Sequence, residues 1–268
     1  MNNGFSIPTA AHLKNVIHSF WHVDRSLPNH KEHIIPNGII EIIFNFSDGD
    51  PINVNLNNQQ YSLPRIFING FNTSPLCLEL PSHQVFFGVR LQPLAVKKIV
   101  GTPPLEFSDK IFDLSLADKG FGSLWHQLAE QTCFETRVTF FCDWVERRLF
   151  NLHGQEEQLN EFLSAIHLHD ISVKDLASTL CYSPRHLSRK IFEVTRMNTE
   201  EILLYKKYLH AVHLIHYSDL TLTQIAYQSN FADQSHFIKS FRSFTQITPG
   251  EYSRNKGQLK GHILENVR

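Results

Sequence analysis

Cationic and polar side chains recur fifty residues apart near the end of this 268-residue chain, at Arg189 in ISVKDLASTLCYSPRHLSRKIFEV and at Lys239 in LTLTQIAYQSNFADQSHFIKSFRSF. In each copy the second half has the spacing of a helix with polar and charged residues on one side. Arginine and lysine can donate hydrogen bonds to guanine O6 and N7, and other polar side chains can bond other base edges. Two such units in one compact block favour the reading of two nearby stretches of DNA.

Caps and apolar spacing predict a helix, a turn and a second helix in each copy. In the first copy Ser172 and Ser183 stand at N-cap positions, and Pro184 follows where a missing N–H costs nothing. In the second copy Thr221 begins a capping-box pattern, and Asp233 caps the next helix. The second helices carry the apolar stripes Leu187, Ile191, Val194 and Phe237, Phe241.

A single long helix is predicted between the two copies, from Glu200 to Tyr217. It would fix the distance between the units, and reading helices held about 34 Å apart can reach two successive major-groove segments. Thr248-Pro249-Gly250-Glu251 predicts one more short helix after the second copy.

The block from Gln158 to Lys256 resembles the DNA-binding region of the AraC/XylS transcription regulators, which carry two helix-turn-helix units joined by a long helix. The likeness is carried by Leu176-Ala177, Ser183-Pro184, Leu187-Ser188-Arg189, Ala211, Ile225-Ala226, Phe231, Asp233-Gln234-Ser235, Phe237, Phe241 and Thr248-Pro249. These motifs are specific when found together in this order, and the block covers a little over a third of the chain.

Four positions depart from the family, which usually has glycine where this chain has Cys181, Arg196, Asn230 and Gln246. Glycine suits such places because their backbone tends to adopt positive φ. Asn230 tolerates that conformation, whereas the other three predict strain or altered turns. Lys207 stands where the family usually has arginine, so a bidentate contact becomes a point charge.

The resemblance also implies which side chains contact DNA. The candidates for base contact are Arg185, Ser188, Arg189, Gln234, Ser235, His236 and Lys239, with His236 the weakest. Lys190, Lys206, Arg242 and Arg254 are expected at phosphates, which add affinity without sequence information. We expect the first reading helix to carry more base specificity and the second to contribute more positioning. The alternative for Arg189 and Lys239 is an ordinary solvated charge, but their equivalent positions in two capped units favour contact.

The charge balance supports this interpretation modestly. The whole chain carries a net charge of −1, whereas residues 183–260 contain eleven Lys+Arg against six Asp+Glu, a local excess of five. DNA binding should therefore weaken with salt, but not to an extreme degree.

The first half of the chain has a β-type pattern. Apolar segments at 39–46, 65–70, 76–80 and 85–91 are separated by Pro, Gly and Asn, which is typical of an antiparallel sheet or barrel. Helices are expected from about Leu94, including an amphipathic one over 135–150 with its apolar face formed by Val138, Phe141, Cys142, Val145 and Leu149, and the polar stretch 151–157 is the expected linker. The predicted fold class is α+β, with a β-rich domain over 1–152, an all-α domain over 155–256 and a tail over 257–268.

This half resembles the β-rich, often cupin-like, sensor domain of many AraC-type regulators, through Ile35-Pro36-Asn37-Gly38, Glu41, Phe44-Asn45, Gly88-Val89-Arg90 and Pro93. The resemblance implies an effector pocket within 30–95 and a dimer helix within 120–150. Glu41 and Arg90 are charged residues in apolar strands and are the candidates for orienting a polar effector. Alternatively, they face solvent or pair with one another, and the helix covers the barrel or the DNA-binding domain.

Sixteen histidines raise the question of a metal site. His22, His30, His33 and His83 lack a recognisable ligand spacing, so surface positions are the preferred interpretation. No metal, cofactor or catalytic residue is therefore predicted, and no G-x-S-x-G, P-loop or dinucleotide fingerprint is present. Four cysteines without CxxC spacing indicate reduced thiols in a bacterial cytoplasm, and no stretch predicts a membrane span.

The leading hypothesis is a sequence-specific transcription regulator of the AraC/XylS type that binds double-stranded DNA and answers a small-molecule effector. A homodimer is a further expectation, as is RNA polymerase as a partner if the protein is an activator. Two alternatives stay open: a cupin-like metalloenzyme with an accessory DNA-binding block, and a degenerate regulator that acts through protein partners. A DNA-repair methyltransferase sharing the block would need zinc-spaced cysteines, which this chain lacks.

Overall fold

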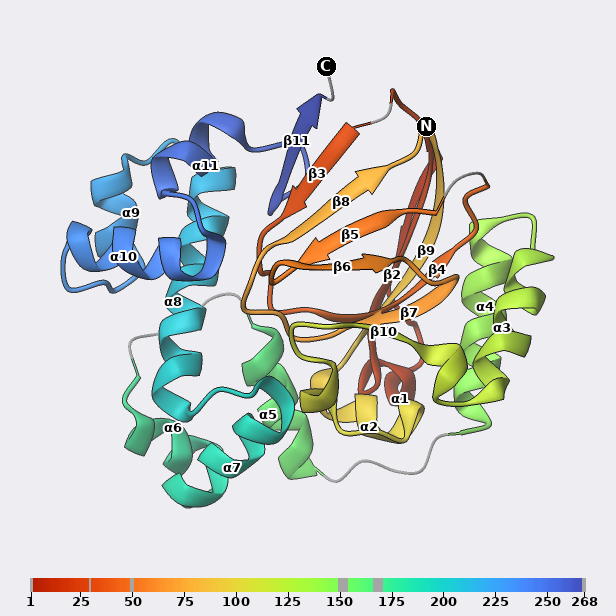
Figure 1. The fold of residues 1–268 in the computed structure, drawn as a ribbon. Coiled ribbons are helices and arrows are strands. Elements are labelled where there is room, and N and C mark those ends of the chain that lie inside the picture. The colour runs from red at the N-terminus through yellow and green to blue at the C-terminus, as the bar shows by residue number, and fades with distance from the viewer. Residues whose placement is uncertain (1, 29, 49–50, 149–153, 166–170, 267–268) are drawn as a thin grey trace.

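Two antiparallel sheets that face each other form the N-terminal half of the molecule (Figure 1). The computed structural model describes residues 2–28, 30–48, 51–148, 154–165 and 171–266. The larger sheet has the strand order β1 (Asn2–Ser6), β2 (Ile17–Ser26), β9 (His83–Leu91), β4 (Ile40–Asn45), β7 (Ile66–Asn69), β10 (Ile111–Asp113). The smaller has the order β11 (His262–Asn266), β3 (His30–Ile34), β8 (Leu76–Leu80), β5 (Asn53–Leu56), β6 (Gln59–Ser62). The four predicted strand segments are thereby confirmed as β4, β7, β8 and β9.

Strand β4 is buried on both of its faces. Ile42 and Phe44 belong to the main hydrophobic core, whereas Ile43 belongs to a second core between the two sheets, together with Val54 of β5. Successive side chains of a strand point to opposite faces, so one strand can serve two cores. The space between the sheets is therefore filled with apolar side chains.

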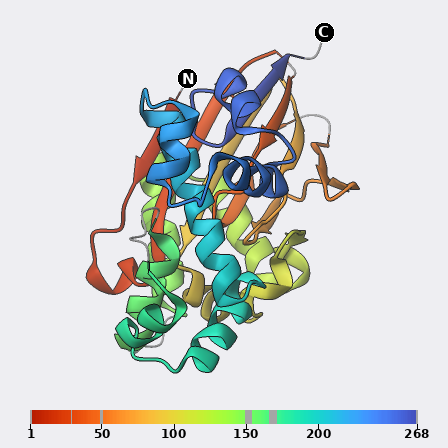
Figure 2. The ribbon, with the colours of Figure 1, turned by 90° about the vertical axis from the view of Figure 1, so that its left-hand side faces the viewer.

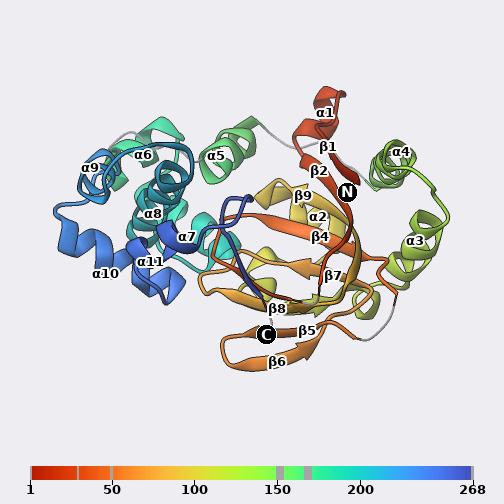
Figure 3. The same cartoon turned by 90° about the horizontal axis from the view of Figure 1, so that it is seen from above.

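Helices cover the outer face of the larger sheet (Figure 3). They are α1 (Ala11–Lys14), η1 (Pro93–Ala95), α2 (Val96–Val100), η2 (Pro104–Phe107), η3 (Leu114–Leu116), α3 (Lys119–Ala129) and α4 (Phe134–Glu146). The Phe141 ring of α4 packs edge-on against Phe20 and Phe44, each at 6.0 Å between centroids. The apolar face predicted for a dimer helix thus covers the sheet. Helix α4 ends at Glu146, and the remainder of the predicted helix, from Leu149, lies outside the described residues.

The C-terminal half is built from helices arranged around one long central helix (Figure 2). They are α5 (Gly154–Ser164), α6 (Val173–Thr179), α7 (Pro184–Thr195), α8 (Thr199–Tyr217), α9 (Leu222–Gln228), α10 (Gln234–Thr245) and α11 (Pro249–Asn255). Helix α8 confirms the predicted long helix and also joins the halves. The hydroxyl of Tyr205 donates to the Asn72 carbonyl (3.1 Å) and that of Tyr208 to the Pro36 carbonyl (2.8 Å).

Two segments differ from their prediction. Helix α5 begins at Gly154, so the stretch 151–157 is helical over its last four residues, while 151–153 lie outside the described residues. The segment predicted as a tail contains β11, which pairs with β3 of the N-terminal half, and Ile263 pairs with Lys256. The His262 ring bonds the Glu32 carboxylate of β3 at 2.7 Å. The end of the chain therefore returns to the first half and holds the two halves together.

Candidate nucleic-acid interface

The N-termini of the four helices in the two units are capped as predicted. In the first unit, Ser172 accepts from the Asp175 N–H (3.1 Å) and Ser183 from the His186 N–H (3.3 Å). In the second unit, the capping box of Thr221 with Gln224 is present, and Asp233 accepts from the His236 N–H at 2.7 Å. These bonds satisfy amide groups that a helix leaves unpaired at its start. The caps therefore place α7 and α10 as the second helices of two helix-turn-helix units.

The two units also end alike, thirteen residues after each second cap (183 to 196 and 233 to 246). Arg196 has φ 60° and Gln246 has φ 63°, both in the left-handed region. In the turns inside the units, Cys181 has φ 56° and Asn230 has φ 58°. The predicted positive φ at all four replaced glycines is confirmed. A side chain in this region costs about 1–2 kcal/mol, with asparagine the best tolerated after glycine.

Lys206 was predicted at a phosphate, and that prediction is wrong because its side chain is 1% exposed. Its ammonium donates to the carbonyls of Leu163 and Ala165 at the end of α5. Burial lowers the pKa of Lys206 to about 7. Lys256 occupies the equivalent place, twenty-three residues after the second cap (183 to 206 and 233 to 256), and donates to the carbonyl of Ile215 in α8. Each lysine therefore donates to carbonyls at the C-terminal end of a helix. For Lys206 this is α5, which precedes the first unit, and for Lys256 it is α8, which precedes the second.

The base-contact candidates lie on accessible parts of α7 and α10. Exposed side chains are Arg185 and Arg189 on α7 and Gln234, Ser235, His236 and Lys239 on α10, while Ser188 is half-buried. Arg189 and Lys239 each follow their cap by six residues (183 to 189 and 233 to 239). Glu193, one turn away, lies 3.8 Å from Arg189 and does not bury it. Both units thus present a cation at the same point of the second helix.

The other phosphate candidates divide into two groups. Arg242 and Arg254 are exposed on α10 and α11. Lys190 is half-buried, and its ammonium lies 3.9 Å from the carboxylate of Glu156 in α5. Of the phosphate candidates, Arg242 and Arg254 therefore have the accessible geometry that phosphate contact needs.

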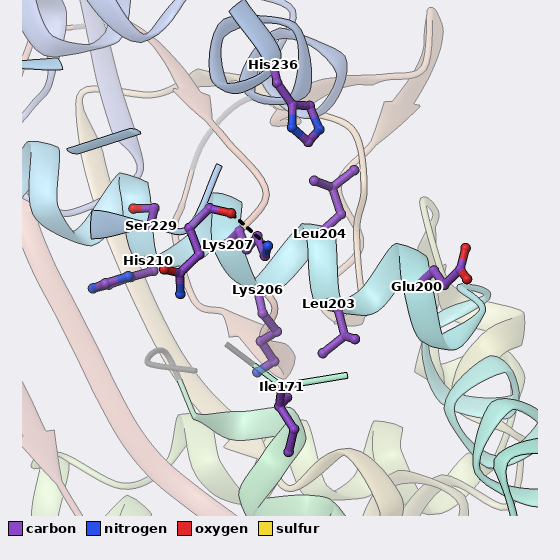
Figure 4. A pocket seen from close by; sticks show the side chains of 10 residues that line it. Ile171, Glu200, Leu203, Leu204, Lys206, Lys207, His210, Ser229 and His236 are labelled. Carbon is purple, nitrogen blue, oxygen red and sulfur yellow. Dashed lines mark hydrogen bonds between the residues drawn. The ribbon is translucent and has the colours of Figure 1, made fainter. Parts of the chain in front are cut away.

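A cavity of about 200 Å³ separates the two units along α8 (Figure 4). Leu203 and Leu204 of α8 line it, with Ile171 on the side of the first unit and His236 on the side of the second. The Lys207 ammonium donates to the Asn230 carbonyl at 2.7 Å, across from α8 to the turn of the second unit. This bond holds the turn of the second unit onto α8.

Glu41 and Arg90 face one another on neighbouring strands of the larger sheet. Arg90 Nε lies 3.6 Å from Glu41 Oε2, and the Trp21 indole N–H donates to the same oxygen at 2.8 Å. Neither charged residue lines the cavity along α8. Of the predicted alternatives, the geometry fits the mutual pair.

The predicted surface positions are wrong for two of the histidines. His22 is 7% exposed and His30 is 5% exposed, whereas His33 is half-buried and His83 exposed. Surface positions were expected because the histidines lack a recognisable ligand spacing, but His22 lies on β2 and His30 on β3, both paired strands. Among the described residues no group of three His, Cys, Asp or Glu side chains is placed to hold a metal ion. No helix in the described ranges combines the length and apolar character that crossing a membrane requires.

Comparison with protein families finds two matching regions. Residues 176–255 match a helix-turn-helix domain family, and residues 6–113 match a domain of unknown function, DUF6597. An uncharacterized helix-turn-helix transcriptional regulator from Staphylococcus aureus (strain MSSA476) is 31% identical over 100 residues, 36% of this chain. The matched part spans only 13% of the length of that relative. The transcriptional activator RhaS from Enterobacter sp. (strain 638) is 26% identical over 108 residues, which make up 39% of this chain and 39% of RhaS.

Solved structures of regulators also align with the chain. ToxT from Vibrio cholerae aligns over 88% of this chain and 98% of its own, with a TM-score of 0.49 and 15% identity. An AraC-type regulator from Chromobacterium violaceum aligns over 33% of this chain and 79% of its own, with a TM-score of 0.32 and 24% identity. The C-terminal part of the chain therefore carries a helix-turn-helix domain of the AraC type, similar to that of the transcriptional activator RhaS.

Proposed function

We propose that the protein regulates transcription by binding double-stranded DNA in a sequence-specific manner with both helix-turn-helix units. The observation that carries this proposal is the pair of equivalent cations, Arg189 and Lys239, exposed on two capped helices that one helix joins. A single solvated charge would need no matching partner in a second unit. Two reading helices on one chain can bind adjacent major-groove segments without a second subunit.

The exposed side chains are proposed to make two kinds of contact, some with DNA bases and others with the phosphates of the DNA backbone. Arg185, Arg189 and Lys239 are proposed to donate to guanine and Gln234 to bond adenine, while Ser188, Ser235 and His236 bond neighbouring base edges. Arg242 and Arg254 are proposed at phosphates. Lys190 adds a phosphate contact only if its ammonium leaves Glu156.

A charge-matched comparison tests the reading face. Arg189→Ala combined with Lys239→Ala should lower affinity for the DNA that the protein selects by at least about 30-fold, because each base contact contributes roughly 1–3 kcal/mol. Lys97→Ala combined with Arg147→Ala removes two exposed cations elsewhere and should leave the affinity within about 3-fold. Gel-shift titration at fixed salt measures both. Equal losses in the two double variants would remove the proposed reading face.

The N-terminal half is proposed to answer a small-molecule effector. Support comes from its separate match over 6–113 and from its contacts with α8, the helix that spaces the two units. A compound that repositions Asn72 or Pro36 would act directly on α8. Screening small molecules for a change in DNA affinity tests this role, and hydrogen exchange in α8 should change with the same compounds.

The proposed role as a transcription regulator also implies a place of action, a further protein partner and an oligomeric state. The bacterial cytoplasm, where the chromosome lies, is the proposed place of action. RhaS is named as an activator, and RNA polymerase is the proposed partner if this chain also activates. A homodimer would need a surface other than the inner face of α4, because Phe141 packs that face on the sheet. Sedimentation at several protein concentrations measures the oligomeric state.

A further inference from the structure

A second cavity, also of about 200 Å³, lies in the N-terminal half where β1 and β2 meet the start of α4. Its charged and polar lining includes His22, Asp24, Cys133, Glu135 and Arg137. The close approach of β1 to α4 depends on glycine, since a Cβ on Gly4 would stand 2.6 Å from the Phe134 ring. The cavity is therefore a feature of how the strand and helix pack. Helix α4, whose start lines it, lies on the opposite side of the molecule from α10 (Figure 3).

Arg137 places a buried positive charge at this cavity. Its side chain is 9% exposed, its Nε donates to the Leu128 carbonyl at 3.2 Å, and its guanidinium lies 4.5 Å from the Phe46 ring centroid. Within the described ranges no carboxylate lies within ion-pair distance of it. A guanidinium has five N–H donors, and the bond to Leu128 engages one of them. A buried charge is costly unless it is paired, which makes a carboxylate ligand favourable here.

The start of α4 adds a second attraction for a carboxylate. The residue before the helix is Cys133, and its side chain makes no capping bond. The first amide groups of the helix thus lack the side-chain acceptor that a Ser, Thr or Asp cap would supply. Helix α4 has thirteen residues, so its N-terminus carries the partial positive charge of a helix dipole. Arg137 and the helix start therefore favour negative charge in the same place.

Acceptors for a cation line the same cavity. Asp24 and Glu135 contribute carboxylates, and Asp24 is otherwise 3.4 Å from His83 at its exposed side. His22 donates from Nδ1 to the Phe86 carbonyl at 2.9 Å, and burial lowers the pKa of His22, so its other nitrogen is an acceptor. One cation against two carboxylates leaves the lining with a formal charge of −1. A simple anion would meet net repulsion, whereas a ligand with both charges would not.

We infer that this cavity binds a small zwitterion of the amino-acid class. Its carboxylate pairs with Arg137 and the start of α4, and its ammonium donates to Asp24, Glu135 and His22. Binding itself does not require that the protein read DNA. If the protein is an effector-responsive regulator, as proposed, this ligand is its effector.

Calorimetric titration of the full-length protein with each common L-amino acid tests the inference. At least one should bind, and its primary amide and its N-acetyl derivative should each bind at least about 10-fold more weakly, because each lacks one charge. Acetate and inorganic phosphate should not compete at equal concentration. Failure of every amino acid to bind, or equal binding of the amide, would overturn the inference.

Variants locate the site. Arg137→Gln and Glu135→Gln should each weaken the amino acid by at least about 10-fold. Arg147→Gln, at an exposed residue just after the C-terminal end of α4, should not change the binding of the amino acid. Glu135 is exposed, so its variant keeps the test valid if Arg137→Gln fails to fold. Unchanged binding in Glu135→Gln would contradict the inference, and a gel shift on the same variant shows separately whether DNA binding is intact.

Discussion

The two helix-turn-helix units have the same ends but different neighbours. Both have capped second helices and a left-handed residue at the same distance after the cap. Behind the first unit, α7 packs on η2 of the N-terminal half. Behind the second, the Phe241 ring of α10 packs edge-on against Tyr208 of α8, with centroids 5.4 Å apart, and the Phe244 ring lies tilted against it at 4.9 Å. The helix ends are therefore alike in the two units while the packing behind them differs, and the first unit rests on the N-terminal half through α7.

The largest expected effect compares the buried residues that lie eight positions after each cap, Ile191 and Phe241 (183 to 191 and 233 to 241). Both are 0% exposed. Phe241→Ala should lower the free energy of unfolding by about 4 kcal/mol and Ile191→Ala by about 3 kcal/mol, because the ring leaves the larger cavity. Urea unfolding of each variant measures the difference, and the opposite ranking would break the account of packing behind the second unit.

The dependence of stability on pH tests the burial of Lys206, the α8 lysine that is equivalent to Lys256. Burial lowers the pKa of Lys206 to about 7 from its ordinary 10.5, so the unfolded chain binds more protons between these values. The free energy of unfolding should therefore gain up to about 1.4 kcal/mol per pH unit from this group as pH rises from 7 towards 10.5, and none below pH 7. Lys206→Met should flatten the rise. A constant offset between wild type and variant over this range would show that Lys206 is not desolvated.

DNA readout should separate the units by specificity. Arg189→Ala should cost about 1–3 kcal/mol on the preferred DNA and relax the choice of base at one position. Lys239→Ala should weaken binding to all sequences more evenly and reduce the salt dependence by about one ion. Gel shifts with a set of single-base variants at several salt concentrations compare them. Equal loss of specificity in both variants would remove the proposed division of roles.

The caps offer a smaller comparison. Ser183→Ala and Asp233→Ala should each lower the free energy of unfolding by about 1 kcal/mol, with Asp233 the larger because its carboxylate also meets the helix dipole. Thermal unfolding gives the ranking. Thr223→Ala, an exposed change inside α9, provides the reference for a substitution that removes no cap.

Glycine at the left-handed positions should have a similarly small effect on the free energy of unfolding, with the opposite sign. Gln246→Gly should raise the free energy of unfolding by about 1 kcal/mol, because glycine adopts φ 63° without the penalty of a side chain. Asn230→Gly should gain less, since asparagine tolerates this region. Chemical unfolding that ranked Asn230→Gly above Gln246→Gly would contradict the assignment of strain.

Cap and turn residues predicted where helices begin and end. Contacts between residues far apart in the sequence decided the features that these local patterns could not predict. Ser183 caps the start of α7, and Gln246 ends α10 in the left-handed conformation. Both features were predictable because they depend on residues close by in the sequence. The prediction for Lys206 was wrong because lysine side chains are usually exposed. Its equivalence to Lys256, at the same distance after the second cap of each unit, was already visible in the sequence repeat. Strand β11 was missed because its pairing with β3 joins residues more than two hundred positions apart. The cavity at Arg137 had no sequence signal, since it forms where β1 meets α4.

Selection of bound sequences from random DNA by the full-length protein tests the central claim most directly. Two enriched half-sites about one helical turn apart are expected, with the site of the first unit more strictly defined than that of the second. Insertion of about half a turn between them should abolish high affinity, since α8 fixes the spacing. Absence of any enriched motif, or a single half-site indifferent to spacing, would contradict the reading of DNA by both units.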